Sequence, residues 1–207
     1  MAIRKRKNDP ALLARVEEEL AESCRVKQEF SDELKSQIVR LAEEMAAVLF
    51  AGGTIYWIGN GGSAADAQHL AAELVGRLRR ARRALRSIAL TTNTSILTAV
   101  ANDASYAEIF SRQVEAHLHS GDMLIGLSTS GNSENVLRAM RAASQQKART
   151  VGWTGMNGGR LRKLAGLCLQ VPSRDTQRIQ ESHITIGHIV CGLLEDLLEG
   201  NKERANG

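Results

Sequence analysis

Apolar residues recur at helical spacing in two segments near the start of the chain, from about residue 10 to 26 and from about residue 31 to 50. Repeats of three and four residues are typical of amphipathic helices. Ser31 stands before the second segment, where its hydroxyl oxygen can accept a free helical amide. We therefore expect two helices, and an apolar stripe on the second that a core or another subunit must cover. The stripe comprises Leu41, Met45, Val48 and Leu49.

From residue 54 onward, short runs of apolar and β-branched residues alternate with helical segments. The runs have the length and composition of strands that are buried on both faces. The expected strands are 54–58, 87–90, 122–127, 150–154 and 167–171. The expected helices are 63–78, 95–101, 106–117, 135–146, a short one after residue 159, and 175–198. This alternation predicts an α/β, three-layer doubly wound fold with a five-stranded parallel sheet, right-handed crossovers and a long C-terminal helix.

A Gly-Asn-Gly-Gly turn at residues 59–62 follows the first expected strand and leads into a helix. Glycines let the backbone turn sharply and approach a ligand closely, and a helix start attracts anions. Ser63 and Asp66 have the spacing of a capping box, in which the serine oxygen accepts a helical amide. One turn further, His69 and Glu73 are four residues apart and share a face, which suits metal ligation or paired proton transfer. An ordinary amphipathic helix with two exposed polar residues would carry the same pair.

A second turn, rich in hydroxyl groups, follows the third expected strand and precedes a helix. Its hydroxyls and backbone amides can converge on one phosphate without a lysine. The turn lacks the Walker spacing, and the first strand is not followed by the Rossmann glycine pattern, which disfavours nucleoside triphosphates and dinucleotides. A phosphomonoester such as a sugar phosphate fits better, although a turn that only caps its helix would look similar. The hydroxyl residues are Ser128, Thr129, Ser130 and Ser133.

The last expected helix carries Gln180 and His188, eight residues apart. At 3.6 residues per turn these side chains lie roughly 80° apart around the axis, so they share a broad face. A lone histidine there would more often be structural. Opposite the helix of His69 and Glu73, however, Gln180 and His188 bring the number of possible ligands around one cavity to four. Nitrogen and oxygen ligands without thiolates suit zinc or another divalent metal.

The composition is that of a compact globular protein of 207 residues, with 43% hydrophobic and 24% charged residues. No apolar run approaches the roughly 18 residues that span a bilayer, and the basic start is not followed by the apolar core of a signal peptide. We therefore expect a cytoplasmic protein that does not enter the membrane. The three cysteines, Cys24, Cys168 and Cys191, are widely spaced, and we expect them to be small core residues.

The net charge of +4 comes largely from the N-terminal tail and from the arginine-rich run at residues 77–86. Such a run can bind nucleic acid or acidic partners. Aromatic residues are only 3% of the chain and none interleaves with the arginines, so platforms for base stacking are scarce. Nucleic acid is therefore an unlikely partner, and a solvated, subunit-facing or phosphate-attracting segment is the preferred interpretation.

Four motifs carry a resemblance to a known family: G-N-G-G-S-A-A-D-A-Q-H-x-A-A-E, T-A-x-A-N-D, S-T-S-G-N-S and R-I-Q-E-x-H-x-x-x-G-H. Over residues from about 31 to 198 the chain resembles the phosphoheptose isomerases of the sugar isomerase (SIS) domain superfamily. The resemblance implies that residues 1–50 form a helical extension that packs on the domain and in the oligomer, and that residues 51–200 form the sugar-phosphate-binding domain. It also implies a homotetramer with active sites at subunit interfaces.

The resemblance further implies roles for individual residues. Glu73 and His188 correspond to the catalytic acid/base pair. The implied zinc ligands are His69, Glu73, Gln180 and His188. The implied substrate contacts are Asn60, Gly61, Gly62, Glu73, Asn102, Asp103, Ser128, Thr129, Ser130, Ser133 and Gln180. The chain departs from common family patterns at Asn93, at Ala104-Ser105 and at Gln177.

The implied reaction is aldose–ketose isomerisation of sedoheptulose 7-phosphate to D-glycero-D-manno-heptose 7-phosphate through an enediol, at the entry to the heptose units of bacterial surface glycans such as lipopolysaccharide. The alternative is a non-enzymatic relative with the same fold, the tetrameric SIS-domain protein that binds the bacterial replication initiator. That group tends to lose the histidine of the last helix and a hydroxyl of the phosphate turn. The presence of His188 and Ser130 favours the enzyme.

Overall fold

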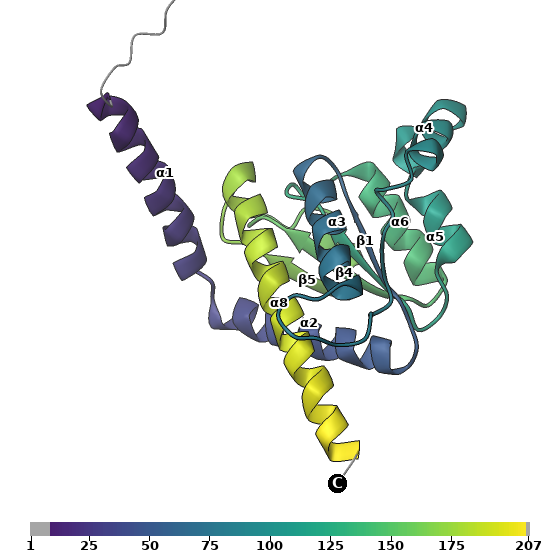
Figure 1. Cartoon of the computed structure of the whole chain (residues 1–207). Coiled ribbons are helices and arrows are strands. Elements are labelled where there is room, and N and C mark those ends of the chain that lie inside the picture. The colour runs from purple at the N-terminus through teal and green to yellow at the C-terminus, as the bar shows by residue number, and fades with distance from the viewer. Residues whose placement is uncertain (1–8, 206–207) are drawn as a thin grey trace, which may run out of the picture.

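The computed structural model describes residues 9–205, and it describes side chains up to residue 199. The chain forms a parallel sheet with helices on both faces, as the sequence predicted (Figure 1). The strands are β1 (Ile55–Gly59), β2 (Ser87–Ala89), β3 (Met123–Leu127), β4 (Arg149–Thr154) and β5 (Leu167–Gln170). The helices are α1 (Pro10–Gln28), α2 (Asp32–Phe50), α3 (Gly62–Val75), α4 (Thr94–Asp103), the 3-10 turn η1 (Tyr106–Glu108), α5 (Ser111–His117), α6 (Glu134–Gln145), α7 (Leu161–Leu164) and α8 (Thr176–Ala205).

The strand order is β2-β1-β3-β4-β5, and every pair is parallel. From β1 the chain crosses to one edge of the sheet, and from β3 it crosses toward the other. The turns after β1 and β3 therefore leave neighbouring strands in opposite directions, and a crevice for ligands opens at such a point. Both turns that the sequence singled out, residues 59–62 and 128–133, lie there.

Two hydrophobic clusters fill the spaces on the two sides of the sheet. One joins the inner residues of α2, α3 and α8 to alternate strand residues such as Trp57 and Trp153. The other joins α5 and α6 to the intervening strand residues, such as Ile58 and Leu124. The predicted stripe of α2 lies wholly in the first cluster, which explains its spacing.

The helix α1 is different, because only Val26 at its end is buried. Figure 1 shows it leaving the body of the protein, with α8 as its main neighbour. Buried Arg178 of α8 donates to the carbonyl oxygen of Glu19 at 2.6 Å, and Ser23 donates to the Glu181 carboxylate at 2.6 Å. The apolar residues of α1 that face solvent are Leu12, Leu13, Val16 and Leu20.

Of three local expectations, one was confirmed, one was wrong and one held in part. Ser31 does cap α2, since its Oγ accepts from the amide of Leu34 at 3.1 Å. Ser63 does not cap α3, because the helix begins at Gly62 and the residue before it, Gly61, adopts a left-handed φ of 54°. Ser63 is thereby drawn into the first turn and buried. Of the three cysteines, all free, only Cys191 is a core residue, whereas Cys24 is exposed.

The longest helix, α8, is anchored to the sheet by a histidine. His183 is fully buried, its ring centroid lies 5.8 Å from that of Trp153, and its Nε2 faces the carbonyl oxygen of Thr154 at 3.3 Å. Burial lowers the pKa of His183 to about 4, and the hydrogen bond to Thr154 offsets only part of that effect. His183 is therefore neutral in the folded protein at physiological pH.

This burial predicts a loss of stability in acid. The unfolded chain binds a proton at His183 near the ordinary pKa of 6.5, whereas the folded chain does not until about pH 4, so acidification between these values favours unfolding. Between pH 7.5 and 4.5 this single group lowers the free energy of unfolding by about 2–3 kcal/mol. The free energy of unfolding is measured by denaturant titration at both pH values, for the chelator-treated wild-type protein and for His183→Gln. The difference between the two proteins in pH dependence then isolates His183, because all other titrating groups are common to both. Equal pH dependence in the two proteins would contradict the assignment.

Candidate active site

The glycine turn after β1 is held in place by an amide pair. Nδ2 of Asn60 donates to Oδ1 of Asn135 at 2.9 Å, and Nδ2 of Asn135 donates back to Oδ1 of Asn60 at 2.8 Å. The hydroxyl of Tyr106 donates to the same Asn60 oxygen at 3.0 Å. The Asn60 oxygen thus accepts two hydrogen bonds, while one of the two N–H groups of its amide remains available for a ligand.

Glycine is required in this turn for two reasons. A side chain at position 59 would collide with Ser63 of α3, and Gly61 has the left-handed conformation that side chains disfavour. No side chain caps the first turn of α3, so its amides face outward above the sheet. Gly61 and Gly62 are both exposed, so their backbone is accessible to a ligand.

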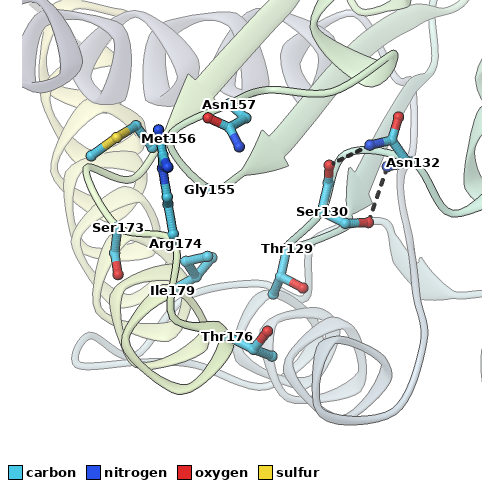
Figure 2. Close-up of a pocket in the computed structure, with 10 residues that line it drawn as sticks. All are labelled: Thr129, Ser130, Asn132, Gly155, Met156, Asn157, Ser173, Arg174, Thr176 and Ile179. Atoms are coloured by element: carbon cyan, nitrogen blue, oxygen red, sulfur yellow. Dashed lines mark hydrogen bonds between the residues drawn. The ribbon is translucent and has the colours of Figure 1, made fainter.

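The four hydroxyls of the second turn divide into two pairs. Ser128, which is buried, and Ser133 bond to each other, with 2.9 Å between their Oγ atoms. Thr129 and Ser130 instead line a pocket of about 300 Å³, which Figure 2 shows in close-up. The Ser130 hydroxyl also accepts the backbone N–H of Asn132 at 3.1 Å, which shapes the turn.

The opposite wall of the pocket comes from the loops after β4 and β5. Gly131 lets the two walls meet, because a side chain there would collide with Gly158 and Gly159. The walls are also joined by a hydrogen bond from the N–H of Gly155 to the backbone carbonyl oxygen of Thr129 at 3.0 Å. Figure 2 shows Arg174 along the wall beside Gly155. The pocket is lined by Thr129, Ser130, Asn132, Gly155, Met156, Asn157, Ser173, Arg174, Thr176 and Ile179.

The expected metal ligands converge on two neighbouring helices. Nε2 of His69 on α3 lies 2.9 Å from Nε2 of His188 on α8 and 3.3 Å from a carboxylate oxygen of Glu73. One ligand atom from each of these three residues lies within 4.8 Å of the other two. Two imidazoles and a carboxylate are a normal donor set for zinc, whose bonds to such ligands are about 2.0–2.2 Å long, so the residues fit a shared ion.

Gln180, the fourth expected ligand, lies elsewhere on α8. It is eight residues from His188, or about 12 Å along the helix, and its amide packs against Gly62 at the start of α3. A side chain at position 62 would collide with that amide. Gln180 therefore contacts the glycine turn, and its place in a four-ligand set stays a prediction.

Asn102 and Asp103 lie at the end of α4, and both are exposed. The Asn102 amide donates to the Asp103 carboxylate at 2.8 Å. The helix α4 buries no residue and packs mainly against η1. Tyr106 of η1 reaches the glycine turn, and this connects the α4 segment to the site.

Sequence reasoning missed Asn135, Tyr106 and Asp66 as parts of this site. Asn135 directly follows the hydroxyl turn and Tyr106 is one of only two tyrosines, but neither carries a recognisable motif. Asp66 was interpreted as half of a capping box. In the structure its Oδ2 is buried without a hydrogen-bond partner among the described residues. Burial raises its pKa to about 6, and the nearby His69 opposes that rise.

The chain is similar to known proteins. Residues 20–155 match the family model described as the SIS domain. The chain is 50% identical to the phosphoheptose isomerase of Aquifex aeolicus, over 90% of this chain and 98% of that protein. It is 54% identical to the phosphoheptose isomerase of Rhodospirillum rubrum, over 78% and 86% of the two chains.

Solved structures agree as well. The phosphoheptose isomerase of Neisseria gonorrhoeae superposes with a TM-score of 0.85 at 43% identity, covering 89% of this chain and 99% of that one. The enzyme of Francisella tularensis gives the same TM-score at 33% identity, covering 89% and 98%. The site residues, the fold and these likenesses together lead to one conclusion: the chain belongs to the phosphoheptose isomerases of the SIS domain family.

Proposed function

We propose that this protein is an aldose–ketose isomerase that converts sedoheptulose 7-phosphate to D-glycero-D-manno-heptose 7-phosphate. The observation that carries the proposal is the His69, Glu73 and His188 group in a chain that belongs to the phosphoheptose isomerases. A carboxylate and an imidazole from separate helices meet there, which is what a two-site proton transfer needs. The hydroxyl-lined pocket supports binding of the phosphate end of the sugar.

In the proposed reaction, the Glu73 carboxylate removes a proton from C1 of the open-chain ketose. An enediol forms, and the same carboxylate returns the proton at C2 to give the aldose. His188 moves protons between the oxygens of C1 and C2. Its Nε2 faces Nε2 of His69 at 2.9 Å, so one of these two nitrogens carries a hydrogen and the other accepts it.

The proposed cofactor is one zinc ion per site, held by His69, Glu73, Gln180 and His188. When bound, the ion would polarise the two substrate oxygens and stabilise negative charge on the enediol. The close approach of His69, Glu73 and His188 supports three of the four ligands. Gln180 would have to turn away from Gly62, where its amide now packs.

The substrate would contact both turns and the helices between them. Asn60, Gly61 and Gly62 would bind it through their free N–H groups, and Ser128, Thr129, Ser130 and Ser133 would bind the phosphate. Asn102, Asp103 and Gln180 complete the proposed set. In one chain His69 lies seven residues beyond Gly62, or about 10 Å along α3, so the substrate must extend along that helix or a second subunit must complete the site.

The proposed assembly is a homotetramer in the cytoplasm. The exposed apolar residues of α1 support it, because a helix with such a stripe needs a partner surface. None of the described helices is long and apolar enough to cross a membrane. The proposed biological role is heptose supply for bacterial surface glycans. The alternative, a non-enzymatic protein that binds the replication initiator, gains no support from the relatives above, which bear the name phosphoheptose isomerase.

The base is tested by Glu73→Gln, which keeps the shape of the side chain but cannot accept the proton. We expect turnover of sedoheptulose 7-phosphate, followed by NMR in deuterated water, to fall by about 10²-fold or more. We also expect solvent deuterium at C2 of the wild-type product, because an enediol exchanges its proton. Glu115→Gln, an exposed carboxylate of α5, serves as the control. Normal turnover and exchange in Glu73→Gln would transfer the role of base to another group.

Metal analysis tests the cofactor. The purified protein should carry about one zinc per subunit, and chelation should lower turnover and the melting temperature together, because an ion that binds only the folded state stabilises it. His119→Gln, a solvent-exposed histidine far along the chain from the ligands, should leave the metal content unchanged. Full activity in chelator with no divalent ion present would remove zinc from the proposal.

The phosphate pocket is tested by Ser130→Ala, which deletes one donor and leaves the helix start of α6 intact. Loss of a hydrogen bond to a charged phosphate should cost about 1.5–3 kcal/mol, which corresponds to a KM about 10- to 150-fold higher, with little change in kcat. Ser36→Ala on the exposed face of α2 is the matched control. An unchanged KM in both Ser130→Ala and Thr129→Val would place the phosphate outside this pocket.

A further inference from the structure

The arginine-rich run at residues 77–86 folds around a buried carboxylate. The two oxygens of Glu195 on α8 accept the backbone N–H groups of Leu78, Arg79 and Arg80 at 3.0–3.1 Å. Oε1 of Glu195 also accepts a hydrogen bond from Nε of Arg82 at 3.0 Å. The Glu195 and Arg82 side chains are only 2% and 7% exposed. Burial alone would raise the pKa of Glu195, but these amides and the Arg82 charge hold it below its usual value.

The other end of the Arg82 guanidinium binds the last turn of α3. Nη2 donates to the backbone carbonyl oxygen of Glu73 at 2.8 Å, and Nη1 donates to that of Leu74 at 2.8 Å. These carbonyls have no partner within the helix, and a positive charge beside them opposes the negative end of the helix dipole. Arg82 therefore caps the turn of α3 that carries Glu73.

Through its contacts with Glu195 and with the α3 carbonyls, Arg82 connects α3 to α8 beside the group formed by His69, Glu73 and His188. Glu195 lies seven residues, or two turns, beyond His188, so the two side chains share a face of α8. One residue before His188, Gly187 lets Leu70 of α3 pack directly against the α8 backbone, since a side chain at 187 would collide with it. The two helices are thus held together by the contact of Leu70 with Gly187 and, two turns further along α8, by the Arg82–Glu195 ion pair.

We propose that the Arg82–Glu195 pair is a positioning device that sets the spacing between α3 and α8, and thereby the separation of His69 and Glu73 from His188. Buried ion pairs add little net stability compared with apolar residues, because desolvation offsets most of the attraction. In some proteins a buried ion pair specifies one geometry, and here the pair joins the two helices that carry His69, Glu73 and His188. The consequence for catalysis rests on the proposed function, whereas the consequence for geometry does not.

The tests use Arg82→Lys and Glu195→Gln in the full-length protein. Lysine keeps the positive charge and can still pair with Glu195, but it lacks the planar fork that reaches both α3 carbonyls. Glutamine keeps the shape of Glu195 and removes its charge. Arg80→Gln is the matched control, because Arg80 lies in the same run and pairs with Asp196 and Glu199 of α8 at the exposed surface.

Crystal structures of the chelator-treated variants measure the geometry without any metal. In Arg82→Lys and Glu195→Gln we expect the His69 and His188 nitrogens to move apart from 2.9 Å, whereas Arg80→Gln should keep that separation. Affinity for Zn²⁺, measured by competition with a chromogenic chelator, should fall 10- to 100-fold in the first two variants only. The visible spectrum of bound Co²⁺ should change with it.

A purely structural role predicts a different result. Both variants would then melt earlier but keep the wild-type separation of the two rings, and that outcome would overturn the inference. Since Glu195→Gln leaves a buried arginine unpaired, it is the variant that risks misfolding, and in that case Arg82→Lys decides alone. If the wild-type protein binds no divalent metal, the proposed cofactor fails, while the ring separation in the metal-free crystals still tests the positioning role.

Discussion

Helices α3 and α8 pack on the same face of the sheet, and the short distance between them is the constraint on which the candidate site depends. Gly187 permits Leu70 to contact the α8 backbone, His69 meets His188 at 2.9 Å, and Gln180 packs on Gly62 at the other end of the contact. Because the helices are closely packed, a shift of one helix at any of these three contacts also displaces the other two contacts. The relative positions of His69, Glu73 and His188 therefore depend on how α3 and α8 pack against each other.

The sheet provides the second half of the site by its strand order. Since β1 and β3 are neighbours, the glycine turn and the hydroxyl turn open at the same edge, and the Asn60–Asn135 amide pair joins them directly. The hydroxyl-lined pocket nevertheless lies at the start of α8, whereas the His69, Glu73 and His188 group lies several turns further along that helix. A site that includes both is consistent with a long substrate or with a contribution from a neighbouring subunit, as the proposed tetramer would supply.

Several features followed from local patterns alone. The five strands were predictable because buried parallel strands are short apolar runs, and the stripe of α2 was predictable because helical spacing marks the covered face. The Ser63 cap failed because a capping pattern says nothing about the left-handed residue, Gly61, that starts the helix earlier. Cys24 was placed in the core by residue type, but α1 leaves the body of the protein and exposes it.

The sequence by itself determined the fold class, the family and which residue types stand at the ends of which strands, because periodicity and motifs are local properties of the chain. Only the tertiary structure decided which side chains meet. His69 of α3 and His188 of α8 are in contact although they are 119 residues apart in the chain, and Arg82 and Glu195 are in contact although they are 113 residues apart. No local pattern distinguishes Arg82, whose side chain is only 7% exposed, from its exposed arginine neighbours. Burial and pairing depend on how the helices pack against one another, and that is a property of the whole fold.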